Sequence, residues 1–137
     1  MDLMEIARER HLKNAFVVSN GIELVSLEPD RAVFQLLIGP NHKNPNGALH
    51  GGVYFTMADA AAGAAAGTDG RRYVTQHGDL HFLRGQSEGT VRAEARVRHR
   101  GRRTCLLEIT VTGEEDRLLA TGTMTYFCVS PAAEGSA

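Results

Sequence analysis

Two glycines, Gly51 and Gly52, stand where the longest predicted helix of the chain begins. The first turn of a helix exposes backbone N–H groups that have no partner within the helix, and glycine lets a ligand carbonyl come close to them. The positive end of the helix dipole strengthens these donors. They could hold the oxyanion that forms when a thioester carbonyl is attacked. For the two glycines alone, a merely flexible helix start is an equally good interpretation.

A single carboxylate, Asp59, lies inside the same helix, where seven alanines occur between Ala58 and Ala66. Aspartate is a poor choice there for helix propensity, and a buried carboxylate needs partners or a function. The alternative is a side chain on the solvent-facing side of the helix. Because this stretch offers almost no other polar group, we favour a functional acid, since acids in unusual surroundings mark active sites.

The spacing of Gly51 and Asp59 predicts an oligomer. Eight residues at about 1.5 Å per residue separate them by roughly 12 Å along the helix axis. That is too far for both to act on one carbonyl. If they belong to one active site, they come from two chains whose helices run antiparallel about a two-fold axis. We therefore expect an isologous dimer with two equivalent sites.

The elements that must position these groups follow from the hydrophobic pattern. Apolar residues at helical spacing predict a short amphipathic helix over residues 3–13, and alanine-rich residues 51–66 predict the long helix. Gly, Pro and Asn mark residues 39–50 as a loop. Alternating or apolar β-rich stretches predict six strands, which cover residues 21–28, 31–38, 72–84, 91–98, 105–111 and 118–128. This order predicts an α+β fold with an antiparallel sheet and the long helix on one face.

Length and composition set the outer limits. A chain of 137 residues fits a single domain, in which residues 1–14 hold the N-terminal helix and residues 130–137 are a small, polar tail that we expect to be disordered. A net charge of −1 gives no general attraction to nucleic acid or to an anionic membrane. No stretch is apolar enough to span a bilayer, and the charged N-terminus is not a signal peptide. We expect a cytoplasmic protein with neither kind of partner.

The residue types that bind metals lack the spacing for it. Cys105 and Cys128 lie in apolar, strand-like stretches, and we expect buried free thiols. His77 and His81 are four residues apart, roughly 13 Å in a strand, so they cannot share one ion. No other group has zinc spacing. We predict no metal and no cofactor, and we interpret these histidines, with Asp79 between them, as surface or subunit-contact residues.

The block from Asn44 through His50-Gly51-Gly52 to Ala58-Asp59 resembles the signature of the hot-dog-fold acyl-CoA thioesterases. The resemblance is closest to their phenylacetate-pathway (PaaI-type) branch. The segment His81-Phe82-Leu83-Arg84 is similar to that branch's strand ending in Phe-Leu-Arg, and residues 98–102 are similar to its basic hairpin. The likeness covers roughly residues 20–128. It departs at Gly85, where relatives often have proline.

The resemblance implies a central helix wrapped by an antiparallel sheet, two subunits joined edge to edge, and dimers often paired into tetramers. It implies hydrolysis of an acyl-CoA thioester, in which CoA is part of the substrate and no cofactor is needed. By position, Asp59 would be the general base or the nucleophile. The Gly51 N–H would polarise the carbonyl, Asn44 would position the water or the carbonyl, and Thr75 would assist the water.

The resemblance also implies substrate-binding residues. His50 precedes the oxyanion loop and could hydrogen-bond within it, beside Gly52. Of Tyr54 and Phe55, one could line an acyl pocket and the other could belong to the core. Guanidinium groups suit the phosphates of CoA, and a solvated turn is the alternative for the hairpin members of this set. The candidates are Arg84, Arg98, Arg100 and Arg102.

Two other functions stay open. A hot-dog enoyl-CoA hydratase or dehydratase would need a histidine paired with a carboxylate near the helix start; His50 is available, but Asp59 stands in the thioesterase position. The chain could also bind acyl-CoA without turnover, although a carboxylate near candidate oxyanion donors favours turnover. The resemblance implies a phenylacetyl-type or other aryl acyl group, with a medium-chain acyl group as the competitor.

Overall fold

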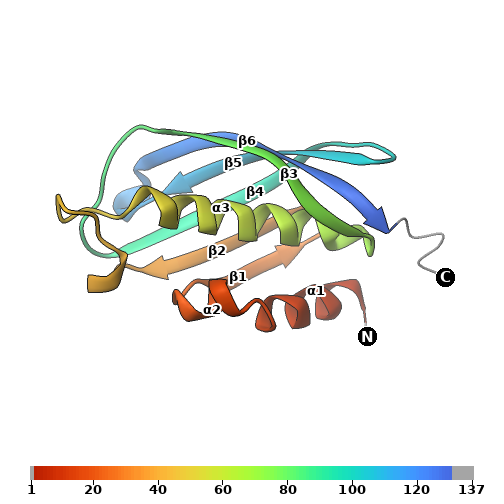
Figure 1. Ribbon diagram of the computed structural model, residues 1–137, viewed down its shortest axis with the longest axis horizontal. Coiled ribbons are helices and arrows are strands. Elements are labelled where there is room, and N and C mark those ends of the chain that lie inside the picture. Colours follow the sequence, from red (N-terminus) through yellow and green to blue (C-terminus); the bar gives the residue numbers. More distant parts are fainter. Residues whose placement is uncertain (1, 131–137) are drawn as a thin grey trace.

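A six-stranded antiparallel sheet curves around one long helix in the computed structural model, which describes residues 2–130 (Figure 1). The long helix is α3 (Gly51–Ala66), and the short helices α1 (Leu3–Leu12) and α2 (Ala15–Ser19) precede the sheet. The strands are β1 (Glu23–Glu28), β2 (Arg31–Leu37), β3 (Arg72–Phe82), β4 (Thr90–Arg100), β5 (Thr104–Thr112) and β6 (Leu118–Ser130). Their order is β1-β2-β4-β5-β6-β3, so β1 and β3 form the two edges.

The predicted α+β hot-dog fold is confirmed, as are the short N-terminal helix, the long helix and all six strands. Helix α2 was not anticipated. It has only five residues, too few to show a helical period, and it begins where Asn14 Oδ1 accepts the Val17 N–H at 3.3 Å. The predicted tail of residues 130–137 lies outside the described residues except for Ser130, which ends β6.

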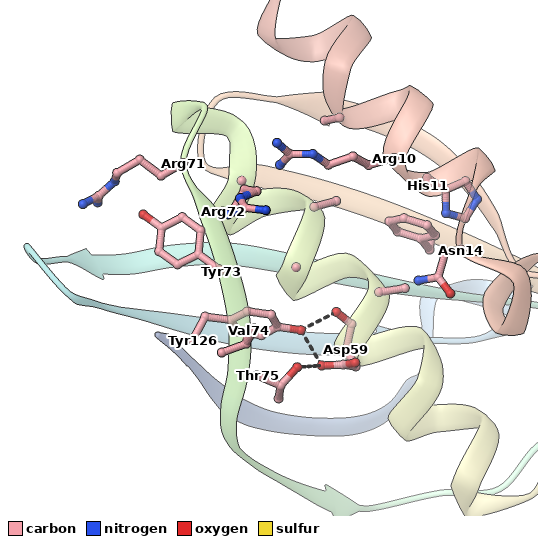
Figure 2. A pocket seen from close by; sticks show the side chains of 16 residues that line it. Arg10, His11, Asn14, Asp59, Arg71, Arg72, Tyr73, Val74, Thr75 and Tyr126 are labelled. Carbon is pink, nitrogen blue, oxygen red and sulfur yellow. Dashed lines mark hydrogen bonds between the residues drawn. The ribbon is translucent and has the colours of Figure 1, made fainter. Parts of the chain in front are cut away.

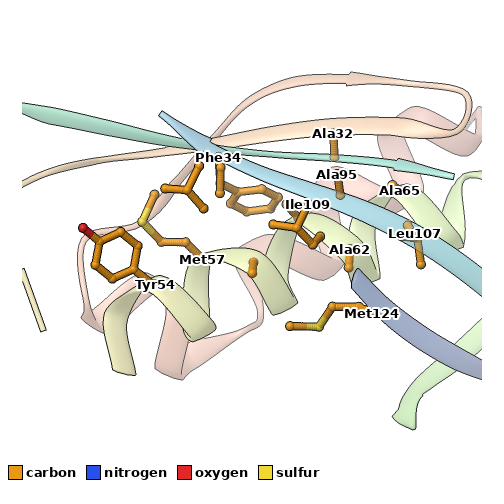
Figure 3. Packing of buried hydrophobic residues seen from close by; sticks show 14 of the residues in the cluster. Ala32, Phe34, Tyr54, Met57, Ala62, Ala65, Ala95, Leu107, Ile109 and Met124 are labelled. Atoms are coloured by element: carbon orange, nitrogen blue, oxygen red, sulfur yellow. The ribbon is translucent and has the colours of Figure 1, made fainter. Parts of the chain in front are cut away.

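Small side chains on both partners bring α3 close to the sheet (Figure 3). Ala58, Ala62 and Ala65 of α3 are fully buried, and so are Ala93 and Ala95 on β4. Alanine also has the highest helix propensity. Larger residues fill the space around this contact, and they include Phe34, Met57, Leu107, Ile109 and Met124. The close approach leaves little room around α3 on the sheet side, so its opposite side remains for other partners.

Arg100 of β4 holds the C-terminal end of α3. Its Nη1 donates to the Ala66 carbonyl oxygen at 2.8 Å and to Asp69 Oδ2 at 2.7 Å, and its Nη2 donates to Asp30 Oδ1 at 2.8 Å. The Tyr73 hydroxyl donates to the same Asp69 oxygen at 2.6 Å. A cation at this end of the helix also meets the negative end of its dipole. The network therefore fixes the turn from which β3 departs.

The charges of this network depend on one another. Burial works against ionisation of Asp69, but hydrogen bonds from Tyr73 and Arg71, together with the charge of Arg100, outweigh it and lower the pKa of this carboxyl. Burial and the hydrogen bond to Asp69 raise the pKa of Tyr73 to about 12. The hydroxyl of Tyr73 therefore keeps its proton and remains a donor to Asp69.

Cys105 and Cys128 are buried free thiols, as predicted. Both side chains are fully shielded from solvent, and burial raises the pKa of Cys105. A thiol in such surroundings is less reactive than an exposed one. We assign both residues to packing.

Candidate active site

Asp59 lies on the side of α3 that faces β3 and β6 (Figure 2). Its Oδ1 accepts a hydrogen bond from Thr75 Oγ1 at 2.8 Å and another from the Tyr126 hydroxyl. The Tyr126 hydroxyl also lies 2.7 Å from the Asp59 carbonyl oxygen, so its one proton is shared between Oδ1 and this oxygen. Within residues 2–130, Oδ2 has no hydrogen-bond partner. One carboxylate oxygen is thus held by the fold and the other is free.

Two cavities meet at Asp59. The first has a volume of about 570 Å³ and lies between α1, α3 and the start of β3; the second, of about 400 Å³, lies between α2, α3 and β3. Asp59, Thr75 and Asn14 line both. Both volumes fall within the range of small-molecule sites, roughly 300–1,000 Å³. The free carboxylate oxygen therefore lies beside space for a ligand.

Small residues of α3 and its C-cap line one side of the first cavity, and residues of α1 line another. Ala60, Gly63 and Ala64 recur on one face of α3, and Gly67 is the C-cap that follows it. Arg10 and His11 face them from α1, where the His11 ring meets Phe34 edge-on with centroids 4.7 Å apart. Sequence reasoning did not include α1 in the site, because nothing in an amphipathic helix specifies what it covers.

At the other end of α3, the backbone N–H groups are not equally available. The Gly52 N–H donates to His50 Nδ1 at 2.8 Å, and the Val53 N–H donates to the His50 carbonyl oxygen at 2.9 Å. His50 is therefore the N-cap of the helix. The Gly51 N–H has no partner in the described part of the chain. Of the two glycine N–H groups, only that of Gly51 is left to bind a substrate. The expectation that the Gly52 N–H also binds the substrate is not supported, because His50 accepts it.

Asn44 closes the loop that leads into α3. Its side-chain oxygen accepts the N–H groups of Asn46 at 2.9 Å and Ala48 at 3.1 Å, and its own N–H donates to the Ala48 carbonyl at 2.8 Å. This leaves the Asn44 amide Nδ2, a double donor, without a partner among residues 2–130. If Asn44 meets the substrate, it does so as a donor.

His42 anchors the same loop and was not singled out from the sequence. Its Nδ1 accepts the Gly39 N–H at 2.8 Å, so its Nε2 donates to the Asn20 carbonyl oxygen at 2.7 Å. Its carbonyl oxygen then accepts the His50 N–H at 2.8 Å. The partner on Asn20 is 22 residues away, and the loop sequence carries no sign of it.

The structure separates the two aromatic candidates. Tyr54 is 3% exposed and belongs to the core, whereas Phe55 is 38% exposed and lines the second cavity. Phe82, at the end of β3, contacts both rings edge-on, with centroid distances of 5.3 Å and 6.2 Å. Phe82 also lies beside the helix start: a Cβ atom placed on Gly51 would be 3.6 Å from its Cζ atom.

The four candidate arginines differ in what they bind. The Arg100 guanidinium is committed to Asp30, Asp69 and the end of α3, so the expectation that it meets a CoA phosphate is not supported. Arg98 pairs with Glu108 on the exposed face of the sheet. Arg84 and Arg102 are exposed, and neither guanidinium has a partner in the region that the structure describes. A run of arginines in the sequence does not reveal which of them turns inward.

Tyr126 is the residue closest to Asp59 that sequence reasoning missed. The alternation of β6 points Met124, Tyr126 and Cys128 inward. An inward tyrosine must find a partner for its hydroxyl. The need of the Tyr126 hydroxyl for a hydrogen-bond partner was the only signal in the sequence, and it does not indicate that Asp59 is the partner.

Between Asp2 and Ser130, no three His, Cys, Asp or Glu side chains are grouped so that they could hold a metal ion. His77 and Asp79 approach each other to 3.6 Å on the exposed side of β3. None of the described helices has the length and apolar character needed to cross a membrane.

An antiparallel sheet curled around one central helix is the arrangement of the hot-dog fold. Comparison with known proteins agrees. Residues 46–120 match the model of the thioesterase superfamily. The chain is 37% identical over 102 residues to the 1,4-dihydroxy-2-naphthoyl-CoA hydrolase of Listeria monocytogenes. The aligned region covers 72% of this chain and 83% of that protein.

A second relative is the acyl-coenzyme A thioesterase PaaI of Escherichia coli, 30% identical over 101 residues, with 73% of this chain and 72% of the relative covered. The solved structure of the E. coli PaaI protein matches with a TM-score of 0.88 at 24% identity, over 94% of this chain and 95% of that one. The chain belongs to the thioesterase superfamily, and within it to the PaaI-type thioester hydrolases with the hot-dog fold.

Proposed function

We propose that this protein hydrolyses acyl-CoA thioesters, with Asp59 as the general base or nucleophile and the Gly51 N–H of a partner subunit as the oxyanion donor. The observation that carries the proposal is the state of the Asp59 carboxylate. Its Oδ1 is held by two hydroxyl groups, and its Oδ2 is left open beside two cavities. The named relatives from Listeria and E. coli are hydrolases of CoA thioesters, which agrees with this chemistry.

Two routes are compatible with one open carboxylate oxygen. As a general base, Asp59 Oδ2 takes a proton from water while the water oxygen bonds to the thioester carbon. As a nucleophile, Oδ2 itself bonds to that carbon and gives a mixed anhydride, which water then cleaves. In both, the C–S bond breaks, CoA leaves as the thiol after protonation, and the Gly51 N–H stabilises the oxyanion. Neither route needs a cofactor.

Thr75 and Asn44 support this chemistry in different ways. The Thr75 hydroxyl donates to Asp59 Oδ1 and, being exposed, can still accept a hydrogen bond from the attacking water. Asn44 Nδ2 can donate to the thioester carbonyl from the loop before α3. Thr75 thus acts on the attacking water together with Asp59, and Asn44 acts on the thioester carbonyl together with Gly51.

The shape of β3 supports a dimer in which each site is shared. β3 is an edge strand of eleven residues, and it pairs with β6 on one side. An unpaired edge of this length can accept another strand. Asp59 binds Thr75 near one end of β3, and Gly51 lies beside Phe82 at the other.

A two-fold axis through the middle of β3, in the region of Gly78, connects these two contacts. If two β3 strands pair antiparallel about this axis, the Phe82 end of one strand lies beside the Thr75 end of the other. Gly51 of the first subunit is then brought toward Asp59 of the second. Pairing of two such dimers into a homotetramer belongs to the same proposal.

The substrate proposal follows from the lining of the cavities and the free arginines. The rings of Phe34, Tyr73 and Tyr126 line the larger cavity, which favours a phenylacetyl-type or other aryl acyl group over a medium-chain one. Arg84 and Arg102 are exposed and free to meet the phosphates of CoA. The hydratase alternative is not favoured, because the lone pair of His50 Nδ1 is committed to the Gly52 N–H.

The test is release of CoA thiol from a panel of aryl and medium-chain acyl-CoA substrates, with Asp59→Asn as the control. The asparagine oxygen can still accept from Thr75 and Tyr126, so the site keeps its shape. We expect turnover by the parent, fastest with aryl substrates, and a loss of about 10²- to 10⁴-fold in kcat for the variant. A variant as active as the parent would refute the role of Asp59. Tight binding of acyl-CoA by both proteins without turnover would instead identify a binding protein.

A further inference from the structure

The Tyr126 hydroxyl ties Asp59 to the sheet at two points. Tyr126 is 3% exposed, and its hydroxyl lies within hydrogen-bonding distance of both the Asp59 carbonyl oxygen and Asp59 Oδ1. Figure 2 shows the ring extending from β6 toward α3, with both contacts at its tip. A single buried donor thus fixes the backbone and the side chain of the same residue.

Helix α3 has a gap in its alanine series where the Tyr126 ring lies. Gly63 is the one residue other than Asp59 that interrupts the alanines between Ala58 and Ala66. Glycine is unfavourable inside a helix relative to alanine. A Cβ atom placed on Gly63 would be 3.4 Å from both Cε2 and the hydroxyl oxygen of Tyr126, and any larger side chain would push the ring away. The helix and β6 are therefore fitted to each other at this contact.

The phenol stays protonated over the range in which an enzyme of this kind would work. Burial raises the pKa of Tyr126 above its ordinary value, and the neighbouring charge of Asp59 raises it further. The hydroxyl can therefore serve as a donor at neutral and mildly alkaline pH. Thr75, the second donor to Oδ1, is exposed, so water can compete with its hydrogen bond but not with that of Tyr126.

We infer that Tyr126 is a positioning residue for thioester hydrolysis: with Thr75 it holds Asp59 Oδ1 and so directs Oδ2 toward the thioester. This inference rests on the proposed role of Asp59. Donors to one oxygen of a carboxylate restrict its rotation and keep the other oxygen in place. Loss of the Tyr126 hydroxyl leaves Asp59 less well aimed, whereas the cavity and the CoA-binding surface are unchanged.

The test is Tyr126→Phe, which keeps the ring and removes the hydroxyl. We expect kcat to fall about 10- to 100-fold, as for loss of one hydrogen bond to a charged group, with KM within about twofold of the parent. The effect should fall on kcat and spare KM, a split that mere loosening of the fold would not produce. Tyr73→Phe is the matched control, because it removes a tyrosine hydroxyl from a different carboxylate, Asp69; its effect should add to that of Thr75→Val.

A double-mutant cycle with Thr75→Val gives a second measurement on an exposed residue. Both hydroxyl groups hold the same oxygen, so the effects of the two single variants should not add in the double variant. Asp59→Asn separates failure of the inferred role of Tyr126 from failure of the proposed role of Asp59. If that variant is inactive but Tyr126→Phe keeps the parental kcat, or the effects of Tyr126→Phe and Thr75→Val add, the role of Tyr126 is refuted and that of Asp59 stands. If Asp59→Asn retains activity, the proposed function itself fails.

Discussion

Among residues 2–130, hydrogen bonding leaves one oxygen of Asp59 and one amide of the helix start without a partner. Thr75 and Tyr126 take up Oδ1 of Asp59, and His50 takes up the N–H of Gly52. The groups that remain are Asp59 Oδ2 and the Gly51 N–H. An acceptor of protons and a donor of hydrogen bonds are what attack on a thioester carbonyl requires.

Gly51→Pro tests the role of the Gly51 amide directly, since it removes this N–H and little else. Proline is well tolerated at the first helical position, and His50 has φ −69° and ψ 138°, a conformation that a residue before proline readily adopts. We expect kcat to fall about 10²- to 10³-fold, as for loss of one oxyanion-hole donor, while thermal unfolding stays near that of the parent. Steady-state kinetics and a thermal melt measure both.

Gly51→Ala is the matched variant, because it adds a methyl group at an ordinary contact distance from Phe82 and keeps the N–H. Its loss should be much smaller than that of the proline variant. Equal losses in the two variants would mean that the backbone position is sensitive to any side chain, and the amide would not be the donor.

At the residue scale, the sequence predicted groups that stand out from their neighbours. Asp59 is conspicuous among alanines and Gly51 at a helix start, whereas Tyr126 looks like any inward residue of a strand. Its partner is 67 residues away, and the contact depends on how β6 lies against α3. Arg100 shows the opposite error: a charge that looked exposed turns inward to bind the end of the helix.

At the scale of elements, α3 is held at both ends by different means. Its start is fixed by the His50 cap and by the loop that Asn44 closes. Its end is fixed by Arg100, which binds the carbonyl oxygens of Ala65 and Ala66. These contacts at the two ends of α3 determine where Asp59 lies along the sheet, because the alanine surface between the two ends offers few directional contacts.

Arg100→Met and Arg98→Met form a matched pair of charge removals on β4. The Arg100 side chain is 20% exposed, and its loss removes one of the cations at Asp69 and the side-chain donor to the Ala66 carbonyl oxygen; we expect the free energy of unfolding to fall by about 1–3 kcal/mol. The Arg98 side chain is 59% exposed and pairs with an exposed Glu108, so its loss should cost less than about 1 kcal/mol. Chemical denaturation measures both, and equal effects would contradict the structural role of Arg100.

The elements themselves followed well from the sequence, because period-two alternation and the alanine run are local signals. β4 is the plainest case: its inward Val91, Ala93 and Ala95 alternate with charged residues. Helix α2 was missed because one turn has no period to detect. Placement of α1 against Phe34 and the first cavity was also beyond the sequence, since it depends on contacts between distant segments.

At the scale of the whole molecule, one chain holds both groups of the proposed active site but not in one place. Gly51 and Asp59 lie on a continuous helix, about 12 Å apart along its axis. The edge strand β3 carries Thr75 and Phe82, the neighbours of these two groups, toward opposite ends, which a two-fold axis through the middle of the strand would bring together. The distance between Gly51 and Asp59 along the helix alone predicted that a second chain is needed. The positions of Thr75 and Phe82 on β3 indicate where that chain would attach.

Mixing two inactive variants tests the shared site most directly. Asp59→Asn and Gly51→Pro subunits are unfolded together, refolded as a mixture, and assayed for CoA release, with sedimentation used to establish that dimers or larger assemblies have formed. If each site takes Asp59 from one subunit and Gly51 from the other, a mixed dimer has one site with both defects and one site with neither. Random mixing should then restore about a quarter of the parental activity. No recovery in assemblies that demonstrably contain both variants would contradict a site shared between subunits.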